Sequence, residues 1–108
     1  MLRKLAVIAA LASGPAFASG IEITVEGEAN GVIKIDLLED VAPEHVERIT
    51  TLAEQGEYDD VVFHRVIDGF MAQTGDVQFG RVGGDTRMAG RGGSSFSDLK
   101  AEFSEVPY

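Results

Sequence analysis

The chain has 108 residues, which is enough for one domain at most, and its 18 acidic side chains outnumber its 9 basic ones to give a net charge of −9. An acidic chain is poorly suited to nucleic acid or to an anionic membrane surface, because both are bound through Lys and Arg. The absence of Cys from the sequence excludes disulfides, thiolate nucleophiles and Cys-ligated zinc.

The N-terminal residues have the order of a secretory signal peptide. A short basic segment is followed by an apolar run at 5–12 and by an Ala-x-Ala pattern that ends at Ala18. The run is much shorter than the ~20 residues of a membrane-spanning helix, although an uncleaved anchor or a buried helix is the alternative. We predict a signal peptide at 1–18 and a mature chain at 19–108. An exported protein without Cys fits a bacterial periplasm better than a disulfide-containing eukaryotic secreted domain. We therefore expect a periplasmic or secreted protein that is free of the membrane after cleavage.

Two strands and a helix are expected next. Residues 21–26 alternate between apolar and polar side chains, as in a half-buried strand, and 32–38 predict a second strand. The turn residues at 27–31 would join them as a hairpin. Pro43 is well placed to start a helix that ends before Gly56. The apolar stripe of this helix would consist of Val46, Ile49, Leu52 and Ala53.

The second half of the chain predicts another hairpin and a long loop. Residues 61–67 are strand-like, a turn signal follows at 68–69, and 70–74 would return as the second strand. Residues 80–95 contain six Gly and no periodicity, which indicates a long loop of the kind that is commonly functional or disordered. We expect regular structure to resume near 101–103.

Most familiar catalytic motifs do not fit this sequence. His45 and Glu47 match half of a zinc deaminase signature, but its Cys residues are missing, and two His outside an HExxH motif make a catalytic zinc site unpromising. Residues 80–85 lack the spacing of a phosphate-binding loop, and 36–40 lack that of a calcium loop. We therefore expect no metal and no cofactor.

One segment is far more specific. Residues 58–76 read YDDVVFHRVIDGFMAQTGD, and this segment resembles the signature of the cyclophilin-type peptidyl-prolyl cis-trans isomerases. The predicted strands, helix, hairpin and Gly-rich loop also occur in the order of that family. The resemblance extends over about residues 21–108, and in detail it is most similar to the bacterial, periplasm-type branch.

The resemblance implies a mainly β fold with α, namely a closed eight-stranded antiparallel β-barrel capped by two helices. This chain would supply the N-terminal half of that barrel, with one helix and a long Gly-rich loop. The family's second signature, and the aromatic, Leu and His positions that complete its proline pocket, have no counterpart in the sequence. We therefore expect an N-terminal fragment or a truncated gene product, with a partial isomerase domain at 19–108.

The resemblance also implies the roles of individual residues. Arg65 matches the catalytic residue that donates a hydrogen bond to the prolyl nitrogen. The substrate-binding positions are matched by Phe70, Met71 and Gln73. The supporting positions are matched by Phe63 and His64. Composition alone favours barrel core for Phe70 and Met71, and it favours a packing role over a catalytic one for His64.

The register of the hairpin provides a separate prediction. A two-residue turn at 68–69 would place Arg65 and Gln73 on opposite faces, because side chains alternate with a period of two. A three-residue connection at 68–70 pairs them on one face, and such connections normally carry a bulge. We therefore predict a bulged hairpin. This register places Ile67 and Met71 beside the pair, and His64, Val66 and Ala72 toward the core.

The leading hypothesis is therefore a peptidyl-prolyl cis-trans isomerase that acts on proline-containing polypeptides during periplasmic protein folding. Rotation about an X-Pro bond breaks no bond and transfers no proton, so such a site needs no metal, cofactor or general base. The alternatives are a non-catalytic proline-peptide binder or folding helper, and a truncated remnant without activity.

Overall fold

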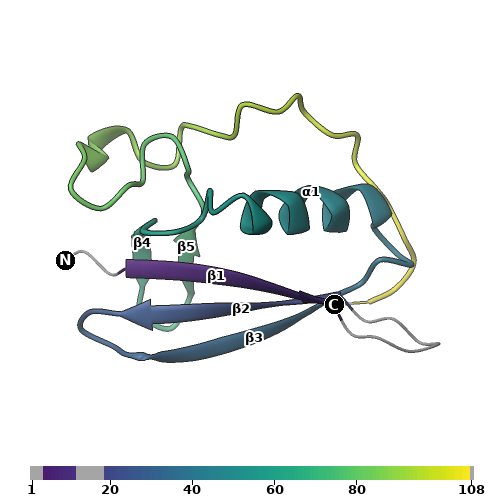
Figure 1. Ribbon diagram of the computed structural model, residues 1–108, viewed down its shortest axis with the longest axis horizontal. Helices are drawn as coiled ribbons and strands as arrows, with labels where there is room; N and C mark the ends of the chain where they lie inside the picture. The colour runs from purple at the N-terminus through teal and green to yellow at the C-terminus, as the bar shows by residue number, and fades with distance from the viewer. Residues whose placement is uncertain (1–3, 12–18, 108) are drawn as a thin grey trace.

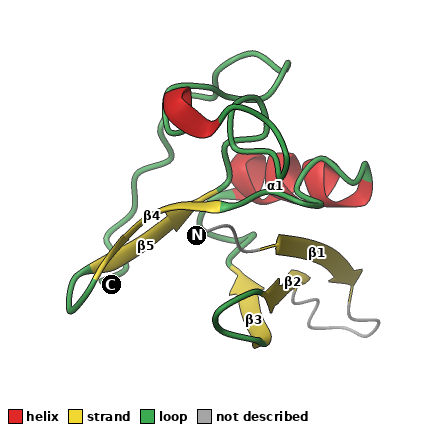
Figure 2. Ribbon diagram, turned by 90° about the vertical axis from the view of Figure 1, so that its left-hand side faces the viewer, coloured by secondary structure: helices red, strands yellow, loops and turns green. Residues whose placement is uncertain are grey.

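The computed structural model describes residues 4–11 and 19–107, which form two antiparallel sheets and one α-helix (Figure 1). The elements are β1 (Lys4–Leu11), β2 (Ser19–Glu26), β3 (Gly31–Leu37), α1 (Pro43–Glu54), β4 (Phe63–Ile67) and β5 (Met71–Thr74). One sheet has the strand order β1-β2-β3, and the other is the β4–β5 hairpin. Figure 2 shows this hairpin extending away from the three-stranded sheet. The described helix and strands confirm the expected mixture of β structure with one helix.

The N-terminal apolar run forms β1 in the structure. This strand pairs with β2 along its whole length, from Lys4 opposite Glu26 to Leu11 opposite Ser19. The sequence placed the segment outside the fold as a leader, whereas the structure pairs it into the sheet. An apolar run can join in this way because the free edge of a strand presents unpaired N–H and C=O groups. The expected cleavage site before Ser19 lies outside the described residues, so cleavage stays a prediction.

The core lies between the β2–β3 hairpin and α1. In the register of β2 and β3, Ile21 lies opposite Ile35 and Ile23 opposite Ile33. Ile21 and Ile23 are buried, as their alternation predicted. The buried core consists of Ile21, Ile23, Ala53 and Val61, with Val25, Leu37, Ile49, Tyr58, Phe63 and Val77 packed against it. The first hairpin and the apolar stripe of the helix are thus confirmed.

The N-terminus of α1 is capped from the far end of the chain. Pro43 occupies the first turn, as predicted, but Ala42 at the cap position has no side chain that could accept a hydrogen bond. Instead the carboxylate of Glu102 accepts hydrogen bonds from the backbone N–H groups of Glu44 (3.1 Å) and His45 (2.8 Å). These bonds satisfy two of the four N–H groups that a helix start leaves without partners.

The segment that contains Glu102 runs along α1 without forming a helix or strand (Figure 1). The expectation of regular structure near 101–103 was therefore wrong. The segment is held by contacts with side chains of α1: Arg48 donates a hydrogen bond to the carbonyl oxygen of Ser97 (2.7 Å), and its guanidinium lies over the ring of Phe96 (4.9 Å). Such contacts leave no periodic pattern in the sequence.

The Gly-rich segment at 80–95 is irregular except for a short 3-10 turn at Thr86–Met88, so the predicted long loop is confirmed. Its start is attached to the chain that leads into β4. Val62 donates a backbone hydrogen bond to Gly80 (2.7 Å), and Val82 donates one to Asp60 (2.8 Å). Val62 is almost completely buried, so this connection belongs to the best-packed part of the molecule. None of the helices in the described part of the chain has the length and apolar character needed to cross a membrane.

Candidate functional site

The β4–β5 hairpin carries the predicted site residues. Arg65 lies directly opposite Gln73, and Ile67 lies opposite Met71, so the three residues at 68–70 form the connection. The N–H of Phe70 closes the turn on the carbonyl oxygen of Ile67 (3.0 Å). The predicted register, with Arg65 and Gln73 on one face, is confirmed.

The predicted bulge is present, but the expected burial of one face is only partly right. The register shifts between Phe63 and Arg65, so the irregularity lies at the base of the hairpin. Both ring nitrogens of His64 are shielded from solvent. Val66 (52% exposed) and Ala72, however, are exposed, and their predicted core position is wrong. Their face opens toward a hollow of about 310 Å³ that Phe63 and Ala72 share with the β2–β3 hairpin, and this hollow is not filled by the described residues.

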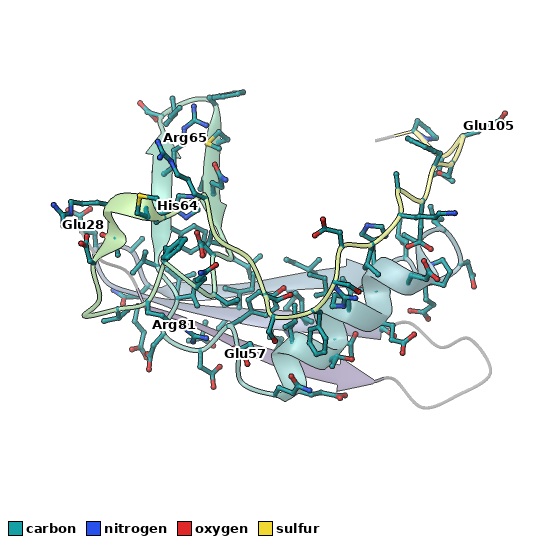
Figure 3. The ribbon with its side chains drawn as sticks, turned by 90° about the horizontal axis from the view of Figure 1, so that it is seen from above. Glu28, Glu57, His64, Arg65, Arg81 and Glu105 are labelled. Atoms are coloured by element: carbon teal, nitrogen blue, oxygen red, sulfur yellow. The ribbon has the colours of Figure 1, made fainter. Side chains whose placement is uncertain are left out.

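Arg65 and Gln73 are available to a ligand. Arg65 is exposed and its side chain makes no hydrogen bond or ion pair with the rest of the described chain, while Gln73 is half-buried. Figure 3 shows Arg65 on the hairpin, which projects from the body of the molecule, with His64 nearer its base. An exposed guanidinium without a protein partner keeps its donors free for a bound peptide.

The apolar residues of the predicted proline pocket lie at the tip of the hairpin. Phe70 is 75% exposed and Met71 is half-buried. Phe70 is thus not buried among the described residues, and whether Phe70 and Met71 serve as pocket or as barrel core stays a prediction. The described residues do not enclose Phe70 in apolar surface, so the proline pocket stays a prediction.

His64 packs against the Gly-rich loop. A Cβ at Gly90 would lie 3.1 Å from Nε2 of His64, and Gly90 has a φ of +98°. A side chain at this position would be crowded and strained, so glycine is the residue that lets the loop approach the imidazole. His64 therefore joins the hairpin to the loop.

Asp76, the last residue of the signature, organises the loop. Its Oδ1 accepts hydrogen bonds from the backbone N–H groups of Gln78 (3.0 Å) and Phe79 (2.8 Å), and its Oδ2 accepts from Gly90 (2.8 Å) and Gly92 (2.9 Å). Asp76 is only 5% exposed. One buried carboxylate thus satisfies four backbone donors and joins the two ends of the loop.

These bonds also determine the charge state of Asp76. Burial favours the neutral acid and raises the pKa, but the four backbone hydrogen bonds stabilise the carboxylate and outweigh burial, so the pKa of Asp76 lies below its usual value. Asp76 is accordingly an anion at neutral pH. We assign it to scaffolding of the loop, because its oxygens are already occupied by backbone donors.

Arg81 has a similar scaffolding role at the start of the loop. Its guanidinium donates hydrogen bonds to the carbonyl oxygens of Val77 and Asp59 (both 2.9 Å) and forms an ion pair with Glu57 (3.0 Å). Figure 3 shows Arg81 and Glu57 near the base of the hairpin, away from Arg65. Arg81 therefore ties the loop to the segment between α1 and β4.

Sequence reasoning did not single out Asp76 or Arg81. The usable signal for Asp76 was an acidic residue directly after Gly75, followed by closely spaced glycines whose N–H groups need acceptors. Arg81 left no comparable signal, because its three partners are two backbone carbonyls and one distant carboxylate. Among the described residues, no group of His, Asp and Glu side chains is arranged to hold a metal ion.

Comparison with known proteins identifies the family. The model of the family "Cyclophilin type peptidyl-prolyl cis-trans isomerase/CLD" matches residues 21–107, which run from the third residue of β2 through the Gly-rich loop and the segment along α1. The chain belongs to the cyclophilin-type peptidyl-prolyl cis-trans isomerase family. The matched residues include β3, α1, β4 and β5 and the Arg65–Gln73 pair, whereas β1 lies outside the match.

Two relatives illustrate the similarity. A "Probable peptidyl-prolyl cis-trans isomerase" of Brucella suis is 51% identical over 81 residues, which are 73% of this cyclophilin-type chain and 41% of the relative. The "Peptidyl-prolyl cis-trans isomerase cyp15" of Rhizopus delemar is 46% identical over 77 residues, 69% of this chain and 11% of the relative. The chain therefore spans less than half the length of these relatives. No solved structure matches it.

Proposed function

We propose that this cyclophilin-type chain provides the Arg65 side of a prolyl isomerase site that acts on X-Pro bonds in polypeptides. The observation that carries the proposal is the pairing of Arg65 directly opposite Gln73 on one face of the β4–β5 hairpin. The guanidinium is a permanently charged donor, and the amide of Gln73 can bond to a peptide backbone. The two side chains together can address a prolyl nitrogen and a neighbouring peptide group.

Rotation about an X-Pro bond requires little more than a well-placed hydrogen-bond donor and a pocket for the proline ring. Amide resonance produces a rotation barrier of ~18–20 kcal/mol, which makes X-Pro isomerisation slow. A donor to the prolyl nitrogen favours the pyramidal nitrogen of the twisted amide, in which resonance is lost. In this proposal Arg65 is that donor, and each ~1.4 kcal/mol removed from the barrier accelerates rotation tenfold.

The remaining requirement is a dry pocket for the proline ring. Phe70 and Met71 offer one apolar side at the hairpin tip, where Phe70 is largely exposed. We propose that the part of the domain that this chain does not share with its longer relatives completes the pocket and the family's eight-stranded barrel. Residues 1–108 alone are then expected to show little or no isomerase activity, because the proline ring is not held.

A chimera tests the role of Arg65. Residues 21–107 of this chain would replace the aligned segment of the Brucella suis relative, and isomerisation of a proline peptide would be measured. Because Arg65 supplies a donor in the transition state, Arg65→Ala should lower kcat/KM by about 10²–10³-fold. The control is Arg87→Ala, which removes an exposed guanidinium whose side-chain partner among the described residues is the neighbouring Asp85. A folded chimera without activity, or one that does not depend on Arg65, would contradict the proposal.

The same assay on residues 1–108 tests the incomplete pocket. Strong Arg65-dependent activity from this chain alone would show that the pocket needs no further residues.

The exposure of Phe70 favours a second candidate function, a proline-peptide binder without catalysis. Chemical-shift changes at the hairpin during peptide titration, without rate acceleration, would support that candidate. An inactive remnant would show no cooperative thermal melt.

We also propose that the protein is exported to the periplasm or secreted. The support is the basic start, the apolar run and the Ala-x-Ala pattern at the N-terminus. The family match begins at residue 21, downstream of the proposed cleavage site. N-terminal sequencing of the protein from a periplasmic fraction should give a chain that starts at Ser19, whereas a cytoplasmic chain that keeps its first residues would contradict export.

A further inference from the structure

The two strands of the β4–β5 hairpin are out of step at its base. Phe63 lies opposite Thr74, whereas Arg65 lies opposite Gln73. Two steps along β4 therefore correspond to one step along β5, so His64 is the extra residue of the bulge. Figure 3 shows His64 nearer the base of the hairpin than Arg65.

The bulge turns Phe63 and Arg65 to opposite faces of the hairpin. Residues two positions apart in a regular strand share a face, because side chains alternate. Thr74 and Gln73 are neighbours in β5 and point to opposite faces, so the residues paired with them do the same. Phe63 packs against the core, whereas Arg65 is exposed. The bulge therefore lets one strand supply a core residue and a site residue two positions apart.

A hairpin without the bulge would lose one of these two placements. If the pairing at the base continued to the tip, Arg65 would lie opposite Ala72, on the face away from Gln73. If the pairing at the tip continued to the base, Phe63 would lie opposite Gly75 and would turn away from the core. The bulged register alone keeps both placements.

The turn fixes the register at the tip. The N–H of Phe70 bonds to the carbonyl oxygen of Ile67 (3.0 Å), and Gly69, the third residue of this turn, has a φ of +73°. Glycine adopts such a conformation readily, as a type II turn requires. The pairing of Ile67 with Met71 is thus determined next to the turn, independently of the base.

The hydroxyl of Thr74 fixes the register at the base. Its Oγ1 donates a hydrogen bond to the carbonyl oxygen of Val62 (2.8 Å). Val62 is only 1% exposed, so water is poorly placed to replace a lost donor. Thr74 thus holds both residues that precede the bulge, Val62 through its hydroxyl and Phe63 through strand pairing.

We propose that Thr74 is a positioning residue for the isomerase site. Its hydroxyl holds the start of β4 against the end of β5 and so preserves the bulge that places Arg65 opposite Gln73. This role rests on the proposed function of Arg65. Thr74 shares the face of its partner Phe63, away from Arg65 and Gln73, so it acts through Arg65 and does not bind the peptide itself.

Kinetics of the chimera described above test this role at a temperature at which circular dichroism shows every variant to be folded. Thr74→Val removes the hydroxyl at similar size, so kcat should fall about tenfold, while KM should change less than about twofold. Thr74→Ala, which also lacks the hydroxyl, should do the same. Thr74→Ser keeps the donor and should recover most of kcat. The matched control is Thr24→Val in β2, because the Thr24 hydroxyl makes no hydrogen bond within the described chain.

Cross-strand nuclear Overhauser effects in the same chimeras report the register independently of activity. Wild type and Thr74→Ser should show both the pairing of Arg65 with Gln73 and that of Phe63 with residue 74, whereas Thr74→Val should weaken at least one of them. A Thr74→Val variant that keeps the wild-type kcat or both pairings, or a Thr74→Ser variant that does not recover, would overturn the proposal. An inactive or Arg65-independent wild-type chimera would instead contradict the proposed function, and the pairings would still decide whether Thr74 holds the bulge.

Discussion

Asp76 is the residue on which the site's surroundings most depend. Its two carboxylate oxygens serve four backbone N–H groups, two just after it and two at the far end of the Gly-rich loop. The hairpin with Arg65 ends two residues earlier at Thr74, and Gly90 in the loop contacts His64. The position of the far end of the loop beside the hairpin therefore depends on this anionic side chain.

Asp76→Asn should lower the free energy of unfolding at pH 7 by about 2–4 kcal/mol, because hydrogen bonds to a charged group are lost and an amide nitrogen would face N–H donors. The pKa of Asp76 is lowered in the folded chain. Its contribution is therefore present above the unfolded pKa of about 3.9 and is lost as pH falls through the lower folded value. The difference between wild type and variant should stay constant from neutral pH to about pH 5 and shrink below about pH 4.

Urea denaturation at a series of pH values measures this difference directly. An unfolding free energy that differs between the two proteins by the same amount at pH 3 and pH 7 would contradict the role of the charge. Equal stability of the two proteins at pH 7 would contradict the scaffolding role as well.

Gly92 is constrained by the same carboxylate. A Cβ at Gly92 would lie 2.6 Å from Oδ1 of Asp76 and 2.7 Å from the ring of Phe79. Gly92→Ala should therefore destabilise the fold by about 1–3 kcal/mol, as overpacking does. The neighbouring Gly93 is the matched control, because a Cβ there meets no atom within 4 Å. Thermal melts should show a lower Tm for the Gly92 variant alone; equal Tm values for both variants would contradict the packing argument.

At the scale of elements, the hairpin shows which features are predictable from sequence. The pairing of Arg65 with Gln73 follows from the two-residue side-chain period and the length of the turn, which are both local. The burial of Val66 and Ala72 does not follow from these local rules, because it depends on a layer that other parts of the molecule must supply. The described chain does not supply this layer, and the hollow beside Phe63 stays open. The local pattern therefore predicted which face these side chains occupy, but not that the face is exposed.

The Gly-rich loop shows what local sequence patterns cannot predict, namely contacts between residues far apart in the chain. Its lack of periodicity predicted an irregular segment correctly, but the contacts that order it join residues 14 and 16 positions apart in the sequence. The same holds for Glu102, which reaches the start of α1 across 57 and 58 positions. A single sequence does not reveal which distant carboxylate meets which backbone donor, so both anchors appeared only in the structure.

The hydrogen bonds from Glu44 and His45 to Glu102 at the start of α1 can be tested by hydrogen exchange. Glu102→Ala should speed hydrogen exchange of the Glu44 and His45 amides several-fold, because these N–H groups lose their acceptor. Amides in the last turn of α1 should be unaffected. Glu105→Ala is the control, since this exposed residue of the same segment does not cap the helix. Unchanged exchange at both amides after Glu102→Ala would show that the contact does not cap the helix in solution.

At the scale of the whole molecule, the two sheets of the described chain are both open, because neither closes on itself. Closure of a barrel is the usual way to remove free sheet edges. In the described part of this chain the edge of β2 is covered by β1, whereas the outer edge of β3 is open. The N-terminal segment thus has two possible roles, as a leader that is removed and as a strand that protects an edge.

Comparing a chain that starts at Ser19 with residues 1–108 tests whether β1 stabilises the fold. Without β1, the N–H groups of β2 that point away from β3 lose their acceptors, so about half of the β2 amides should exchange faster than in residues 1–108. Amides bonded to Asp76 should keep their protection, because their acceptors lie within residues 19–107. Equal exchange of β2 in both chains would mean that β1 does not stabilise the sheet in solution.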